Sequence, residues 1–321
     1  MLIKWISTKK NVDTDITDLV PTVTWEGSIH QATRKCQIDV LNAPNDKNIQ
    51  DLKVVIACGD VIKLFENDEL IFYGEVQRIE KKGETGTVSY EARDILGHLL
   101  RIEHNEKFKN KRPEQITKKL LKMYGYGVGN IEETKKVLPK LIVGSNVYEA
   151  IMKAYRKAAT GEKYMLKMQG KKVNVIKKGE LVDTIVLDEE TNIISSEYEE
   201  TIENMVNRVD IFNKKGKQIG QVKNAGHIKR YGLYKANYEK EKNVNAKKAA
   251  RVLLTGPEKS ISVEVINGDV KCVAGMAVEV KDKATGLSGI FYVDQDVHTW
   301  SEGNHKMKLD LNFKNVMEAS S

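Results

Sequence analysis

The sequence contains one pattern twice. The first copy begins at Gly59 and ends at Asp94, and the second begins at Gly275 and ends at Asn312. When residues 71–73 (IFY) are aligned with residues 290–292 (IFY), the rest of each copy aligns without a gap, so only the first turn differs in length. The two copies are therefore expected to form the same local structure.

Each copy has the alternation of strands with one buried face. Apolar residues that align between the copies are separated by polar ones, and they are Val88, Tyr90 and Ala92 in the first copy and Met307, Leu309 and Leu311 in the second. A period of two is typical of a strand with one face in a core. Each copy is predicted to form three antiparallel strands, joined by short turns at residues 66–68, 82–84, 283–286 and 301–304.

A fourth strand precedes each copy, because residues 37–42 (QIDVLN) resemble residues 262–267 (SVEVIN). A four-stranded sheet leaves open edges, so each copy is expected to curl into a small barrel together with neighbouring strands. The fold class is α+β and mainly β, with two similar antiparallel β-barrel-like domains on either side of a small α+β domain.

The period changes in the middle of the chain. Ile116, Leu120 and Met123 have helical spacing after Pro113, and a second helix is predicted from Ser145 as its N-cap. Three short strands follow, with turns at Gly170 and Gly179. The predicted domains are residues 1–103, 104–190 and 191–321, and the last of them contains a further helix at about residues 245–255. Residues 44–51 are predicted to form a polar loop, and residues 317–321 a frayed end.

Composition excludes several classes of protein. No apolar run approaches the roughly 20 residues that span a bilayer, and the N-terminus lacks the features of a signal peptide, so synthesis in the cytoplasm without membrane insertion is expected. Cys36, Cys58 and Cys272 stand singly in apolar runs and are interpreted as core thiols. The net charge of +7 permits a nucleic-acid partner. The densest basic cluster, residues 107–122, is however more typical of a solvated face.

Candidate catalytic and metal sites are weak. The glycines at 125, 127 and 129 follow a predicted helix, so they are interpreted as a helix end and loop and not as a phosphate loop. The aspartates at 13, 15 and 18 lack the glycine and glutamate of a calcium loop. His298 and His305 flank one turn, but their counterparts Ile79 and Gly86 cannot bind metal. No catalytic, cofactor-binding or metal-binding residue is therefore predicted.

Several stretches together resemble the hub proteins of contractile phage tails and phage-derived particles, the XkdQ/YqbQ group within the late-control-D class. Their order and spacing carry the resemblance, and they are residues 59–60 (GD), 70–74 (LIFYG), 90–94 (YEARD), 203–209 (ENMVNRV), 229–232 (KRYG), 245–254, 289–294 (GIFYVD), 298–300 (HTW) and 305–307 (HKM). Asn207, Arg208, Tyr231 and Gly232 match the family pattern and are interpreted first as strand and turn residues, with an interface role as a second possibility.

The resemblance implies a homotrimeric baseplate hub that adapts a hexameric tail tube to a central spike. Its implied partners are the tail tube protein, the spike protein, and baseplate wedge and tape-measure components, without cofactors or specific nucleic-acid binding. The implied location is the baseplate of a virion or phage-tail-like bacteriocin assembled in the bacterial cytoplasm. Two alternatives stay open at this point: a tail-associated cell-wall hydrolase that uses the acidic run at residues 197–203, and a basic nucleic-acid-binding barrel protein.

Overall fold

The computed structural model describes residues 1–7, 12–41, 54–81, 86–242 and 244–315. These residues form two compact units. Unit 1 is residues 1–196 with 262–321, and unit 2 is residues 197–261. The predicted loop at 44–51, the turn at 82–84 and the end at 317–321 lie outside the described residues.

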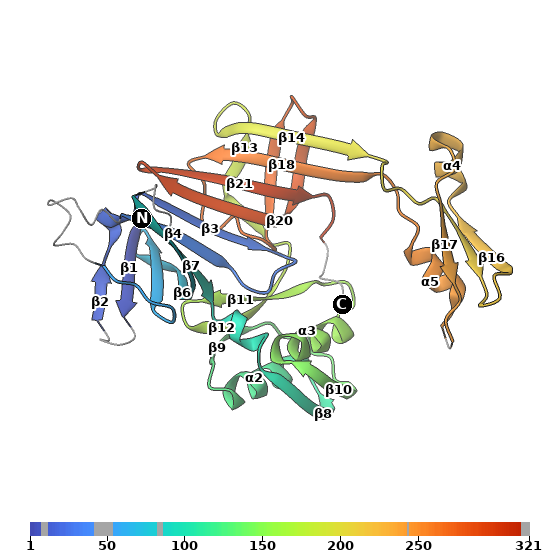
Figure 1. Cartoon of the computed structure of the whole chain (residues 1–321), viewed down its shortest axis with the longest axis horizontal. Helices are drawn as coiled ribbons and strands as arrows, with labels where there is room; N and C mark the ends of the chain where they lie inside the picture. The colour runs from blue at the N-terminus through green and yellow to red at the C-terminus, as the bar shows by residue number, and fades with distance from the viewer. Residues whose placement is uncertain (8–11, 42–53, 82–85, 243, 316–321) are drawn as a thin grey trace. The chain divides into compact units, whose positions relative to one another are not determined.

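A 13-stranded sheet dominates the fold (Figure 1). Its strands are β1 (Leu2–Ser7), β2 (Val12–Asp15), β3 (Thr22–Ser28), β4 (Lys35–Leu41), β5 (Val61–Glu66), β6 (Glu69–Lys81), β7 (Thr87–Asp94), β13 (Leu181–Asp188), β14 (Ile193–Thr201), β18 (Glu258–Ile266), β19 (Ala277–Asp282), β20 (Leu287–Ser301) and β21 (Asn304–Asn312). The prediction of a mainly β chain is confirmed.

The two copies of the repeat form the predicted strands. In the first copy β5, β6 and β7 pair in antiparallel order, and in the second β19, β20 and β21 do the same. The fourth strands are also in place, since β4 pairs with β7 and β18 lies beside β21. The shared pattern in the sequence therefore corresponds to a shared strand order.

The alignment of the middle strands needs a correction. Leu64 pairs with Phe72, whereas its counterpart Val280 pairs with Gly289. Phe72 thus corresponds in the ladder to Gly289, and Phe291 lies two residues further along. A slip of two residues leaves every side chain on its original face, so the apolar pattern could not reveal it. The expectation that only the first turn differs in length is wrong. Lys81 pairs with Val88 and His298 pairs with Met307, so the second hairpin is two residues longer in the second copy. With that insertion the last strands still correspond, because Ala92 pairs with Val76 and Leu311 pairs with Val293.

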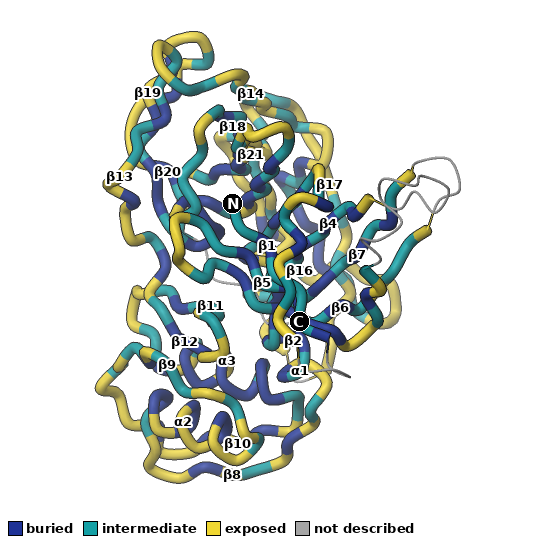
Figure 2. Tube along the Cα trace, turned by 90° about the vertical axis from the view of Figure 1, so that its left-hand side faces the viewer, coloured by how far each residue is buried: buried dark blue, intermediate teal, exposed yellow. Residues whose placement is uncertain are grey.

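The expectation of two separately closed barrels is not confirmed, because the described strands form one open path that starts at β14 and ends at β2. The reason is β3, which pairs with β4 of the first copy and with residues 295–301 of β20 in the second. Because β3 lies between the two copies, the backbone hydrogen-bonding groups at the facing edge of each copy are paired within one continuous sheet. Buried residues alternate with less buried ones along these strands, as the burial colours show (Figure 2).

The middle of the chain forms a layer of helices and small sheets in unit 1. Its elements are α1 (Leu96–Leu99), β8 (Glu103–Lys111), α2 (Pro113–Met123), β9 (Gly127–Ile131), β10 (Leu138–Asn146), α3 (Val147–Ala158), β11 (Tyr164–Gln169) and β12 (Lys172–Lys177). The predicted helices are confirmed, but α3 is capped by Asn146, whose side chain accepts a hydrogen bond from the Glu149 N–H at 2.8 Å, and not by Ser145. Helix α2 ends before Gly125, which has a φ of 75°.

Unit 2 is small and has its own core. It contains β15 (Arg208–Phe212), β16 (Gln218–Lys223), α4 (Ala225–Tyr231), β17 (Lys235–Glu239) and α5 (Ala246–Val252). The three strands pair in the order β16-β15-β17, and Val209, Ile211, Val222 and Ala250 form the buried cluster. The helix predicted near residue 245 is confirmed as α5.

No helix in the described ranges has the length and hydropathy to cross a membrane. Two of the three cysteines are core thiols as predicted, since Cys36 and Cys272 are buried. Cys58 is exposed, which corrects the third assignment. It lies in the turn before β5, where the alternation of the strand does not extend.

Candidate functional site

Arg34 lies where the two copies of the repeat meet. Its guanidinium group donates two hydrogen bonds to the carboxylate of Asp296 on β20, one of them at 2.9 Å to Oδ1. The same group stacks 3.9 Å from the ring of Trp25 on β3. Asp296 is fully buried, so this is a desolvated and paired charge. Gly27, opposite Asp296 in the ladder, leaves the space that Arg34 fills, because a Cβ there would lie 2.3 Å from Arg34 Nη1.

The backbone of Arg34 contacts the first copy. Its N–H donates to Asp94 Oδ2 at 3.0 Å, and the N–H of Leu96 donates to Asp94 Oδ1 at 3.1 Å. Asp94 is the last residue of β7. Burial raises the pKa of Asp94 to about 7, against these hydrogen bonds and the charges of Arg34 and Arg93, which lower it. One residue between β3 and β4 therefore holds a carboxylate from each copy.

His298 extends this polar junction. Its Nε2 lies 3.2 Å from the carbonyl oxygen of Cys272, and its Nδ1 lies 3.0 Å from His305 Nε2. Burial lowers the pKa of His298 to about 4, so the ring is neutral at pH 7. A neutral ring satisfies both contacts when Nε2–H donates to Cys272 and Nδ1 accepts from His305.

The two histidines face one another, as their places beside one turn allowed, but they are joined directly by a hydrogen bond. The hydrogen bond between them occupies the lone pair that His298 Nδ1 would offer to a metal ion. Within the described residues, no group of three or more His, Cys, Asp or Glu side chains could hold a metal ion. The geometry favours a structural role for this pair.

A cleft of about 420 Å³ lies beside the junction, between strands of the large sheet, including β13, and the small sheet of β9, β11 and β12. Arg34, Lys167 and Lys271 line it together with Glu69, Glu180 and Asp183. Burial lowers the pKa of Lys167. Because equal numbers of acidic and basic side chains line the cleft, its charge favours neither an anion nor a cation.

Unit 2 brings together two of the four residues that match the family pattern. Asn207 is buried, and its side chain donates to the carbonyl oxygen of Gly232 at 2.7 Å and accepts from the Tyr234 N–H at 2.9 Å. Gly232 ends α4 with a φ of 88°, a conformation that favours glycine. Asn207 thus fixes the turn between α4 and β17.

Arg208 and Tyr231 lie outside that contact. Arg208 pairs with Asp210, with Nε 2.7 Å from Oδ1, and Lys235 adds a second cation at 3.3 Å. Hydrogen bonds from Arg208 lower the pKa of Asp210. Tyr231 is half-buried and packs edge-on against His227, with ring centroids 6.0 Å apart. The interpretation of these residues as strand and turn positions agrees with their location, and an interface role is left as a proposal.

The acidic run does not form a catalytic pair in the described structure. Glu197, Glu199 and Glu200 lie exposed on β14, and Glu203 lies exposed just beyond it. Glu200 accepts a hydrogen bond from Tyr198 at 2.9 Å and pairs with Lys259 at 3.5 Å. A glycosidase needs one carboxyl group with a raised pKa, whereas these contacts lower the pKa of Glu200.

Sequence reasoning missed the junction residues Arg34, Asp94 and Asp296. A signal was present on β20, where Asp296 and His298 occupy inward positions between the apolar residues Val293 and Trp300. A charged residue in the apolar phase of a strand indicates a buried partner. The partner itself could not be read, because Arg34 is 262 positions away.

Comparison with known proteins agrees with the architecture. A family model described as YQBQ-like matches residues 23–312. The phage-like element PBSX protein XkdQ of Bacillus subtilis (strain 168) is 23% identical over 319 residues, which cover 95% of this chain and 96% of that protein. The uncharacterised protein YqbQ of the same strain is 22% identical, over 91% of this chain and 92% of that protein.

Solved structures share the fold. The 43 kDa tail protein of prophage MuSo2 from Shewanella oneidensis superposes with a TM-score of 0.71 at 12% identity, over 97% of this chain and 96% of that chain. The E. coli c3393 protein, a component of the type VI secretion system with structural similarity to the T4 tail proteins gp27 and gp5, gives 0.52 at 8% identity, over 94% and 74%. Since the family match runs through both copies of the repeat and the junction between them, the chain belongs to the YqbQ-like family, the group that its sequence resembles.

Proposed function

We propose that this chain is a structural hub protein in the baseplate of a contractile phage tail or phage-tail-like bacteriocin. Membership of the YqbQ-like family supports this function, as does the fold shared with a prophage tail protein and with a component of the type VI secretion system. In this proposal the chain is not an enzyme. It is assembled in the bacterial cytoplasm and becomes part of the virion or tail-like particle.

The observation that carries the proposal is the duplicated four-strand unit within one sheet. A hexameric tail tube that ends on a three-fold spike has a symmetry mismatch. Three subunits with two similar units each present six similar modules to the tube and keep three-fold symmetry towards the spike. The duplication therefore has a direct use in a homotrimer.

In this proposal, the barrel-like closure expected from the sequence forms only in the homotrimer. In the described residues β2, β13 and β14 each pair with one strand, so each leaves an edge open. We propose that neighbouring subunits supply what closes the ring, because open edges are a liability in an isolated protein. The domain boundaries at residues 103/104 and 190/191 are part of the same proposal. In it, the middle domain, residues 104–190, faces baseplate neighbours.

The proposed partners are two further copies of the chain, the tail tube protein, the central spike protein, and wedge and tape-measure components. Arg208, which also pairs with Asp210, and Tyr231 are proposed as the residues of unit 2 that contact a partner, because both are partly exposed whereas Asn207 is buried and holds the turn. Arg208→Ala with Tyr231→Ala should then reduce incorporation into particles without loss of folding.

The experiment that tests the function is peptide mass spectrometry of sedimented tail-like particles from an induced culture, with copy number per particle. We expect about three copies beside tube and sheath proteins. If the chain is found in the soluble fraction alone, the hub proposal is wrong. Zymography of wild type and Glu203→Gln then tests the hydrolase, and salt-dependent binding tests the nucleic-acid alternative.

A further inference from the structure

The sheet edge at β8 is open while the opposite edge of the same small sheet is covered. β8 and β10 pair with each other in a two-stranded sheet. On the β10 side, α3 supplies two cations to backbone carbonyl oxygens: Lys153 Nζ donates to Ile142 at 3.1 Å and Lys157 Nζ donates to Lys140 at 2.7 Å. No described residue provides a comparable hydrogen bond on the β8 side. A free strand edge is a template for another strand.

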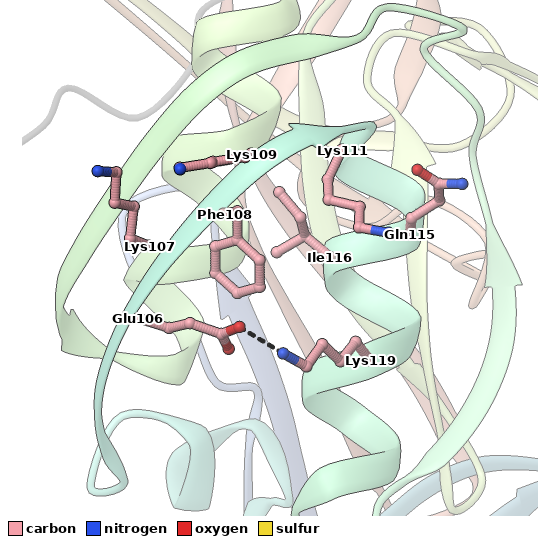
Figure 3. A pocket seen from close by; sticks show the side chains of 8 residues that line it. All are labelled: Glu106, Lys107, Phe108, Lys109, Lys111, Gln115, Ile116 and Lys119. Carbon is pink, nitrogen blue, oxygen red and sulfur yellow. Dashed lines mark hydrogen bonds and ion pairs between the residues drawn. The ribbon is translucent and has the colours of Figure 1, made fainter.

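A cleft of about 210 Å³ runs along this open edge, between β8 and α2 (Figure 3). Phe108 from the strand and Ile116 from the helix are buried and form its apolar part. Side chains at the rim carry the charge, and they are Lys107, Lys109, Lys111 and Lys119. The cleft therefore has an apolar floor with cations at its rim.

The rim has spare positive charge. Lys107, Lys109 and Lys111 are exposed, and none of them forms an ion pair with a described residue. Lys119 differs, because it is bonded to Glu106 and lies 5.3 Å from the Phe108 ring. That internal pair shows how a carboxylate is accommodated in this cleft. Lys107, Lys109 and Lys111 can therefore pair with carboxylates of another molecule.

We propose that β8 is a docking edge for an extended acidic segment of a partner protein. The segment adds as a third strand beside β8, and its backbone supplies the missing hydrogen bonds. Since side chains of a strand alternate between two faces, apolar residues can face the floor formed by Phe108 and Ile116 while glutamates or aspartates in alternate positions meet Lys107 and Lys109. This assignment does not depend on the hub function.

The probe is a synthetic peptide of alternating glutamate and valine, labelled with fluorescein and titrated with the full chain. We expect binding that weakens with salt, and a loss of about tenfold or more in the variant Lys107→Glu with Lys109→Glu. The matched control is Lys118→Glu with Lys122→Glu, which removes the same charge from exposed positions on α2 outside the cleft. It should change the affinity by less than about twofold. Equal losses in the two variants would overturn the proposal, because they indicate attraction to net charge alone.

Strand addition is tested separately from charge. A peptide with the same glutamates and with prolines in place of the valines cannot form the ladder, so it should bind at least about tenfold more weakly. Hydrogen exchange on the wild-type chain should show new protection of amides in residues 103–111 when the valine peptide is added. Equal binding of both peptides, or tighter binding of a single-stranded oligonucleotide that is lost with Lys107→Glu and Lys109→Glu, would contradict the proposal.

Discussion

The C-terminal halves of β6 and β20, residues 76–81 and 295–301, occupy corresponding positions in the two copies of the repeat but differ in how deeply their residues are buried. In the ladder Ile79 pairs with Tyr90, and Asp296 pairs with the matching residue Leu309. Ile79 is half-buried, whereas Asp296 and His298 are fully buried. The difference comes from the next strand: residues 76–81 of β6 pair with β7 alone, while residues 295–301 of β20 lie between β21 and β3.

The comparison shows that neighbours decide what a repeated strand can hold. Where the first copy has the half-buried Ile79, the more buried strand has the charged Asp296, which is tolerated because Arg34 neutralises it. The buried His298 is tolerated because a backbone carbonyl oxygen accepts its hydrogen bond. A buried polar group also selects which strands pair. Asp296 has its hydrogen-bond partner Arg34 only when β3 lies beside β20, with Gly27 opposite Asp296. The following predictions test this contrast, from the largest effect to the smallest.

Arg34→Met should destabilise unit 1 by about 3–5 kcal/mol, because Asp296 is left buried without its cation. Unfolding in urea, followed by tryptophan fluorescence, measures the change. The double variant Arg34→Met with Asp296→Asn should recover part of the loss, since the uncompensated charge is gone. If the double variant is less stable than Arg34→Met by the full cost of a second defect, the pair does not act as a unit.

Phe72→Ala and Phe291→Ala should each cost about 3–4 kcal/mol, because both rings are buried, at 3% and 4% exposure. The surroundings differ: Phe72 belongs to the core beneath the first copy, and Phe291 packs on Phe313 with ring centroids 5.4 Å apart. Removal of the outer ring in Phe313→Ala should therefore reduce the effect of Phe291→Ala and leave that of Phe72→Ala unchanged. Double-mutant cycles from urea unfolding measure both couplings.

The junction should produce opposing dependences of stability on pH. Between its ordinary pKa of 6.5 and the folded value of about 4, His298 binds a proton in the unfolded chain and not in the folded one, so its contribution to stability falls as the pH falls. Asp94 has the reverse effect between about 7 and 3.8, because its proton is bound in the folded chain.

His298→Gln should remove the first of these effects. Relative to wild type, the variant should gain about 3 kcal/mol between pH 6.5 and pH 4, as judged from urea unfolding at a series of pH values. Asp296, Arg34 and His305 all face this ring, so His30→Gln at an exposed position serves as the control. A constant difference between His298→Gln and wild type across this range would show that the ring titrates normally.

Arg78→Met should change the stability by no more than about 0.5 kcal/mol. Arg78 lies on β6, and its guanidinium is 3.3 Å from Glu80 with 66% of the side chain exposed. The Arg78–Glu80 ion pair is exposed, in contrast to the buried Arg34–Asp296 pair. Unfolding in urea measures the effect here as well. A loss as large as that of Arg34→Met would mean that burial does not explain the contrast between the copies.

The sequence by itself determined the local elements and the repeat. The alternation around Val88 and Met307 predicted the strands, and Pro113 and Gly125 marked the limits of a helix. These features depend on residues close together in the chain, where periodicity and capping act. The family resemblance also followed from the order of short motifs, and the match over residues 23–312 confirms it.

The tertiary structure alone decided how the copies are joined. Insertion of β3 between them, the two-residue shift of Phe291, and the pairing of Arg34 with Asp296 all depend on contacts between distant segments. The lysine-rich strand β8 was interpreted from sequence as a solvated basic face, since its open edge is visible only once β10 is paired on the other side. A period of two fixes which face of a strand is buried, but the choice and register of its neighbours come from long-range packing that no local pattern encodes.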